Sequence, residues 1–222
     1  MNFSIDPRLS ALGIHVILVL AERLSIQRTD EALELEKKRV IQEIEVRWRS
    51  ESVQNNPILN GFKALYRLFG EDPGKVIPSA RYLIDCVLKN KRFLTINTAV
   101  DIYNMISATS LLTLGAHDAS KLGDDFRLAI TDGSEEFIPL CKQFTEKVNP
   151  GRYAYMTGNQ IICWLDVRQG ESTKVTLDAK SIVVIVQGNK AVDNSYLRET
   201  ADRLCENLSR YCGGEAKIIW PI

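Results

Sequence analysis

Five β-branched aliphatic residues follow one another without a break from Ile182 to Val186. A strand at a surface alternates apolar and polar side chains, whereas a strand between two packed layers needs apolar side chains on both faces. We therefore predict a central strand over 181–187. The next segment, 193–212, carries apolar residues at helical spacing and ends at Gly213 and Gly214, which predicts a helix that packs on the sheet.

Other segments alternate between helical and strand patterns in no strict order. The predicted strands are 3–9, 13–24, 126–130, 153–156, 161–165 and 174–177. The predicted helices are 30–49, 57–69, 79–88 and 100–112, and 115–123 reads as a polar loop. Because strict βαβ alternation is missing, we predict a single α+β domain over 1–222 with a mixed sheet and packed helices, in which 1–55 contributes N-terminal strands and a helix.

Composition indicates a protein of the cytoplasm that binds nucleic acid weakly, if at all. Lys plus Arg and Asp plus Glu both number 28, so the net charge is zero. Proteins that hold RNA by neutralising phosphates usually carry a basic excess. No secretory signal or membrane span is expected, and neither is DNA binding. The five cysteines include no CxxC pair, so we expect reduced thiols, no metal site and no cofactor.

Familiar catalytic signatures are missing from the sequence. It contains no GxGxxG, GxxxxGK[ST], HExxH or GxSxG motif. His15 lies in an apolar strand, where it is expected to be a packed core residue. His117 lies in the predicted polar loop beside Asp118, which leaves two alternatives: a solvent-facing loop residue or local hydrogen-bond partner, or a member of a binding pocket.

The most informative segment is Ile96 to Asn104. Its polar residues at 97, 101 and 104 fall on one side of a helix start. Asn97 can cap the helix and Asp101 can hold the preceding backbone, so both are expected to form a scaffold. Capping does not explain Asn104, which lies a full turn further on, and its amide is expected either to face water or to line a cavity.

This segment resembles a run in the tRNA-editing B3/B4 domain of the phenylalanyl-tRNA synthetase β chain, Asn-x-Val-Val-Asp-x-Thr-Asn-Tyr. Segments 114–122, 126–135 and 169–184 resemble further motifs of that domain in the same order. Upstream, Tyr66-Arg67, Asp72-Pro73 and Pro78-Ser79 resemble stand-alone bacterial members of the family. The resemblance covers 56–222 and implies the B3/B4 fold. In the synthetase this domain hydrolyses tyrosine wrongly attached to phenylalanine tRNA.

The resemblance also implies which residues form the pocket. Asn104 matches the pocket asparagine, and Tyr103 stands where the family has threonine. The chain departs from the family at three further positions: Gly115 aligns with the pocket histidine, Ile185 with a glutamate, and Gln169 with the first glycine of a Gly-Gly pair. An unpaired tyrosine hydroxyl against Ile185 would cost roughly 1–3 kcal/mol, so an apolar or differently shaped aminoacyl group is expected.

Two functions remain open. One is a deacylase that hydrolyses mischarged aminoacyl-tRNA in trans or binds its aminoacyl group, without metal or covalent nucleophile and without being a complete synthetase. The other is a non-catalytic module, binding a small molecule such as a free amino acid or a protein, that kept the fold and lost the chemistry. No catalytic residue is assigned. The residues expected to form the pocket are Tyr103, Asn104, Gly115, His117, Arg127, Gly170 and Ile185.

Overall fold

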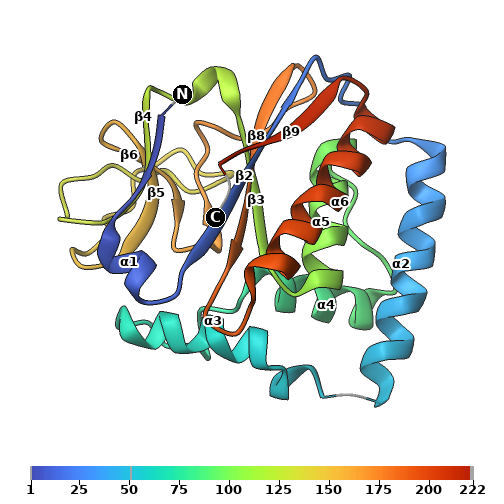
Figure 1. Ribbon diagram of the computed structural model, residues 1–222, viewed down its shortest axis with the longest axis horizontal. Helices are drawn as coiled ribbons and strands as arrows, with labels where there is room; N and C mark the ends of the chain where they lie inside the picture. The colour runs from blue at the N-terminus through green and yellow to red at the C-terminus, as the bar shows by residue number, and fades with distance from the viewer. Residues whose placement is uncertain (1, 51, 221–222) are drawn as a thin grey trace.

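The computed structural model, which describes residues 2–50 and 52–220, contains two β-sheets and a layer of helices (Figure 1). The predicted α+β fold is confirmed, but the strands form two sheets where the sequence predicted one. The four-stranded sheet has the order β3-β8-β2-β9, and all its neighbours are antiparallel. Its strands are β3 (Thr113–Asp118), β8 (Ser181–Gly188), β2 (His15–Glu22) and β9 (Glu215–Trp220).

Strand β8 lies between β3 and β2, so the predicted central strand is confirmed. Successive side chains of a strand point to opposite faces. Accordingly, the even-numbered residues Ile182, Val184 and Val186 pack into the core under the helices. The odd-numbered Val183 and Ile185 pack into a second core between the two sheets. Burial on both faces explains why the strand carries no polar residue from 182 to 186.

The five-stranded sheet has the order β1-β4-β5-β6-β7. Its strands are β1 (Asn2–Ile5), β4 (Asp125–Ile130), β5 (Tyr153–Thr157), β6 (Gln160–Trp164) and β7 (Arg168–Gln169). Strand β1 runs parallel to β4 and the other neighbours are antiparallel, so this sheet is mixed, as predicted.

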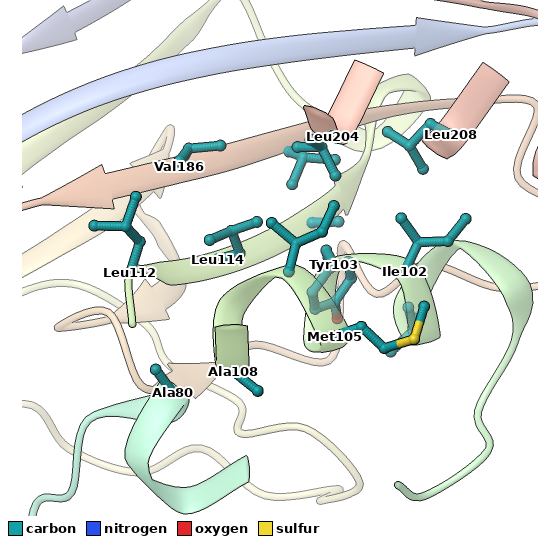
Figure 2. Packing of buried hydrophobic residues seen from close by; sticks show 14 of the residues in the cluster. Ala80, Ile102, Tyr103, Met105, Ala108, Leu112, Leu114, Val186, Leu204 and Leu208 are labelled. Carbon is teal, nitrogen blue, oxygen red and sulfur yellow. The ribbon is translucent and has the colours of Figure 1, made fainter. Parts of the chain in front are cut away.

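Helices cover the face of the four-stranded sheet that points away from the other sheet (Figure 1). Figure 2 shows Leu204 and Leu208 of α6 with Leu114 of β3 and Val186 of β8 in this core, so the predicted packing of 193–212 on the sheet is confirmed. Helix α2 packs outside α4 and α5. The bounds are α2 (Glu31–Ser50), α3 (Pro57–Leu68), α4 (Ser79–Asn90), α5 (Thr98–Ser110) and α6 (Asn194–Cys212), with 3₁₀ turns η1 (Val53–Asn55) and η2 (Ala119–Lys121).

Three sequence predictions are wrong. The predicted strand 3–9 ends at Ile5, because the Asp6 carboxylate accepts the Arg8 N–H (2.9 Å) and starts the short helix α1 (Pro7–Ala11). Of the predicted loop 115–123, residues 115–118 belong to strand β3, whose backbone pairs with β8, and 119–121 form η2. The predicted strand 174–177 is a turn region, where the Asp118 N–H donates to Thr173 O (2.8 Å).

Strand β9 was missed, because the exposed residues Glu215 and Lys217 interrupt its apolar pattern at the edge of the sheet. No helix in the described part of the chain is long and apolar enough to cross a membrane.

Candidate functional site

A cavity of about 650 Å³ opens between the two sheets, beside helices α4 and α5. Exposed lining residues form the mouth: Tyr82 (56% exposed), Leu94 (63%), Ile96 (43%), Leu140 (42%) and Lys142. Four buried polar lining residues are joined by hydrogen bonds and form a cluster that we call the inner end: Thr113, Tyr155, Asp166 and Gln187. The rest of the lining is mainly apolar and includes Val100, Leu114 and Ile185. The cavity therefore has a volume and a polarity suited to a small organic ligand.

One wall is formed by alternate residues of two paired strands. Residues 113, 115 and 117 of β3 share a face, because strand side chains alternate. Across the ladder, Gly115 pairs with Ile185 and Thr113 pairs with Gln187. The two positions that align with the family's histidine and glutamate are thus direct neighbours in the structure. Replacing both by Gly115 and Ile185 makes the centre of this wall apolar.

Helix α5 presents Tyr103 and Asn104 to the same cavity. The Asn104 side chain is half-buried and has no hydrogen bond to any residue that the structure describes. Burial raises the pKa of the Tyr103 phenol, which is neutral at physiological pH. Both groups can therefore offer hydrogen bonds to a ligand without carrying charge.

The start of α5 is fixed by the two scaffold residues. Asn97 Oδ1 accepts the Val100 N–H (2.9 Å), and Asn97 Nδ2 donates to Val175 O (3.3 Å) on the cavity wall. Asp101 accepts the Ile96 N–H (2.9 Å) and forms a buried ion pair with Lys37 of α2 (2.9 Å). Asp101 and Asn97 do not line the cavity; they hold the helix that does.

His117 lies buried in strand β3 and lines the cavity. Of the two alternatives from sequence, the solvent-facing one is wrong. The ring is 1% exposed, and Nδ1 lies 2.7 Å from Thr173 Oγ1. Nε2 has no hydrogen-bond partner in the described part of the protein. Burial lowers the pKa of His117 to about 3, so the imidazole is neutral at pH 7. His15 is only partly buried and does not line the cavity.

Gln169 occupies the space in front of Gly115. A Cβ atom at position 115 would lie 2.8 Å from Gln169 Nε2, which is closer than packed atoms allow. The same Nε2 donates to Ala116 O (3.3 Å). The Gln169 amide thus occupies space that any side chain at 115 would need. The departures at 115 and 169 are therefore physically linked.

The inner end holds a buried polar network that the sequence did not reveal. The Asp166 carboxylate accepts O–H hydrogen bonds from Tyr66 of α3 (3.0 Å) and Tyr153 of β5 (2.5 Å). Burial raises the pKa of Asp166, while hydrogen bonds from Tyr153, Thr113 and Tyr66 oppose that shift. These residues come from four separate segments. An aspartate after an apolar strand is equally typical of a turn, so sequence gives no usable signal for it.

Two expected pocket residues lie elsewhere. Arg127 of β4 donates to the Asp125 carboxylate (2.8 Å) and to Gly158 O (2.7 Å) and does not line the cavity. Gly170 also lies off the cavity wall, and a Cβ atom there would lie 3.0 Å from Ile161 O. Its role is close backbone packing, and its N–H donates to Ile162 O (2.7 Å).

The chemistry of the cavity is that of binding and hydrogen bonding. Cys163 lines it, but burial raises the pKa of that thiol, so it is protonated and a poor nucleophile. Within the described residues, no group of three or more His, Cys, Asp or Glu could hold a metal ion. A hydrolytic reaction here would rest on a water molecule held by neutral polar groups, such as Asn104, His117 and Gln169.

Comparison with known proteins identifies the relatives of this chain. The model of the B3/4 domain family matches residues 62–213. The chain is similar to the phenylalanine–tRNA ligase beta subunit of Malacoplasma penetrans (strain HF-2), with 26% identity over 148 residues, which is 66% of this chain and 18% of that protein. The chain thus spans less than a fifth of that relative's length.

The fold is similar to a solved structure as well. An N-terminal fragment of the phenylalanyl-tRNA synthetase beta subunit from Pyrococcus horikoshii superposes with a TM-score of 0.51 and 14% sequence identity. The match covers 97% of this chain and 50% of that fragment.

Proposed function

This chain belongs to the B3/4 domain family, and from that premise we propose that its cavity binds the aminoacyl group of a charged tRNA and that it hydrolyses mischarged aminoacyl-tRNA in trans. The observation that carries the proposal is the convergence of four positions on one cavity. Asn104, which matches the family's pocket asparagine, lies with Gly115, His117 and Ile185 around the same space of about 650 Å³. The beta-subunit relative supplies the link to tRNA.

The proposed reaction is attack of water on the ester between the amino acid and the tRNA. His117 does not act as a general base in it, because a base with a pKa of about 3 is too weak to take a proton from water near pH 7. Its neutral imidazole instead orients water or substrate by a hydrogen bond. The rate enhancement then comes from positioning and from neutral donors aimed at the developing oxyanion.

A deacylation assay tests this proposal. The purified chain is incubated with tRNAs that carry each of the twenty amino acids, in cognate and mischarged form, and loss of the aminoacyl group is followed against an uncatalysed control. We expect accelerated loss for one or a few amino acids. If no charged tRNA is deacylated faster than the control, the hydrolytic part of the proposal is wrong.

One observation supports a second candidate function. The cross-strand pair Gly115·Ile185 stands where the family pocket has its histidine and its glutamate, and Gln169 fills the space in front of Gly115. This arrangement favours a module that binds an aminoacyl group or a free amino acid without hydrolysing it. Binding of a non-hydrolysable aminoacyl-adenosine together with no deacylation of any tRNA would favour this second function.

A further inference from the structure

We propose that Asp166 and Gln187 form a polar subsite at the inner end of the cavity, which takes the distal hydrogen-bond donor of an aminoacyl side chain: a hydroxyl, carboxamide or ammonium group. This inference rests on the proposed function, since it assumes that an aminoacyl group enters the cavity. It adds a selection rule for the side chain. The subsite is distinct from the apolar wall at Gly115 and Ile185.

Asp166 supplies the acceptor. It is 9% exposed and lines the cavity, and its carboxylate accepts hydrogen bonds from Tyr66 at one oxygen and from Tyr153 at the other, with Thr113 as a third donor. A carboxylate has about four acceptor positions, so capacity remains for a ligand. No ion pair joins Asp166 to a cation in the described part of the chain. A buried carboxylate without a cationic partner attracts a group that brings N–H or O–H donors.

Gln187 supplies a second polar atom. The residue is completely buried, lines the cavity, and accepts the Tyr155 O–H at its Oε1 (2.6 Å). That bond orients the amide, and its Nε2 then has no hydrogen-bond partner among the described residues. A buried N–H without a partner costs free energy, which a ligand oxygen could recover. A hydroxyl or a carboxamide satisfies both residues, because each of these groups donates and accepts.

The apolar lining limits which amino-acid side chains fit the cavity. Most of the remaining lining is apolar and includes Val100, Leu114 and Ile185. A matching side chain is therefore apolar along its stem and polar at its tip. A wholly apolar side chain would contact the apolar lining but would form no hydrogen bond with Asp166 or Gln187. An acidic one would bring its charge against the Asp166 carboxylate.

Non-hydrolysable 3′-aminoacylamino-3′-deoxyadenosines test the inference without requiring catalysis. Three pairs differ at the side-chain tip: tyrosine and phenylalanine, glutamine and methionine, lysine and norleucine. Dissociation constants are measured by calorimetry. We expect the donor-bearing member of at least one pair to bind about 10- to 100-fold more tightly than its partner. The pair that discriminates identifies the donor as hydroxyl, amide or ammonium.

Two variants assign the preference to the subsite. Asp166→Asn and Gln187→Met should each reduce the ratio within the discriminating pair to below about 3-fold. Asp178→Asn makes the same change as the first variant at an exposed position and should leave the ratio intact. Because the readout is a ratio within one protein, partial loss of folded protein does not change it. If one variant fails to fold, comparison of the other variant with the wild-type ratio still shows whether the subsite causes the preference.

The outcomes separate this inference from the proposed function. Binding of aminoacyl probes without discrimination in any pair overturns the subsite and leaves the proposed function standing. An unchanged ratio in both variants also overturns the subsite. If none of the six compounds binds, the proposed function itself fails, and the subsite fails with it.

Discussion

The imidazole of His117 has a protonation state set by burial, and this gives a pH-dependent prediction. Its pKa falls to about 3 in the folded protein, against an ordinary value of 6.5. A lowered pKa means that the unfolded chain binds the proton more readily. The contribution of the neutral imidazole to the unfolding free energy is therefore fully present above pH 6.5. It is lost as the pH falls toward 3, by up to about 1.4 kcal/mol per pH unit.

The His117→Gln variant isolates this contribution, because glutamine does not titrate. We expect the difference in unfolding free energy between wild type and variant to shrink as the pH is lowered from 7 to 4.5, measured by urea unfolding. A difference that stays constant over this range would show that His117 is accessible to protons in the folded state.

Asn97, the N-cap of α5, and Asn104, about two turns further along the helix, form a matched pair. Asn104→Ala should weaken ligand binding or deacylation and leave the melting temperature nearly unchanged, because its amide bonds to no described residue. Asn97→Ala removes the same atoms but also the helix cap, and should cost about 1–2 kcal/mol of stability. A loss of stability at Asn104 with no change in binding would make that residue structural.

At the scale of elements, the contact between β3 and β7 should show thermodynamic coupling. Gly115→Ala places a Cβ atom 2.8 Å from Gln169 Nε2 and forces that amide away from Ala116 O. We expect a loss of about 1 kcal/mol in unfolding free energy. In a Gln169→Ala background the same change should cost little, so the two effects are not additive. Additive effects would mean that Gln169 already leaves room for a side chain at 115.

A buried ion pair between Lys37 and Asp101 joins α2 to α5, beside the apolar side chains that α2 packs into the core. Lys37 is 3% exposed and also donates to Thr95 Oγ1 (2.9 Å). Lys37→Met leaves the Asp101 carboxylate buried without its cation, and should cost about 3 kcal/mol. Lys38→Met, at an exposed neighbour on the same helix, should change stability by less than about 0.5 kcal/mol.

Unfolding in urea measures both variants, and adding Asp101→Asn to Lys37→Met should recover part of the loss. A cost below about 1 kcal/mol for Lys37→Met would indicate that the ion pair contributes little to the attachment of α2.

At the scale of the whole molecule, the balance of charge limits how the chain can hold RNA. With 28 basic and 28 acidic residues, affinity for tRNA must come from a local patch. We expect weak binding whose logarithm falls gently with the logarithm of salt concentration, as few phosphates are neutralised. Filter binding between 50 and 200 mM salt measures the slope. A slope equivalent to about six or more phosphates would reveal an extended basic face.

The sequence by itself determined the elements whose patterns are local. The β-branched run 182–186 predicted β8, the helical spacing of 193–212 predicted α6, and the polar residues of 97–104 predicted the cap and the backbone anchor of α5. These three predictions are correct because a helix cap and a hydrophobic period depend on residues that are neighbours in the chain. The resemblance to the B3/B4 domain rested on the same short runs.

Only the tertiary structure decided what those elements enclose. Residues 115–118 of β3 read as a loop because Gly115, His117 and Asp118 interrupt the apolar pattern, and only the pairing with β8 makes them a strand. Asp166 meets Tyr66 across 100 positions of sequence, and Gln169 meets Ala116 across 53. Local patterns report whether a residue is buried or capped, but not which distant side chain it meets. The polarity of the cavity depends on those long-range contacts, and so does the choice of ligand.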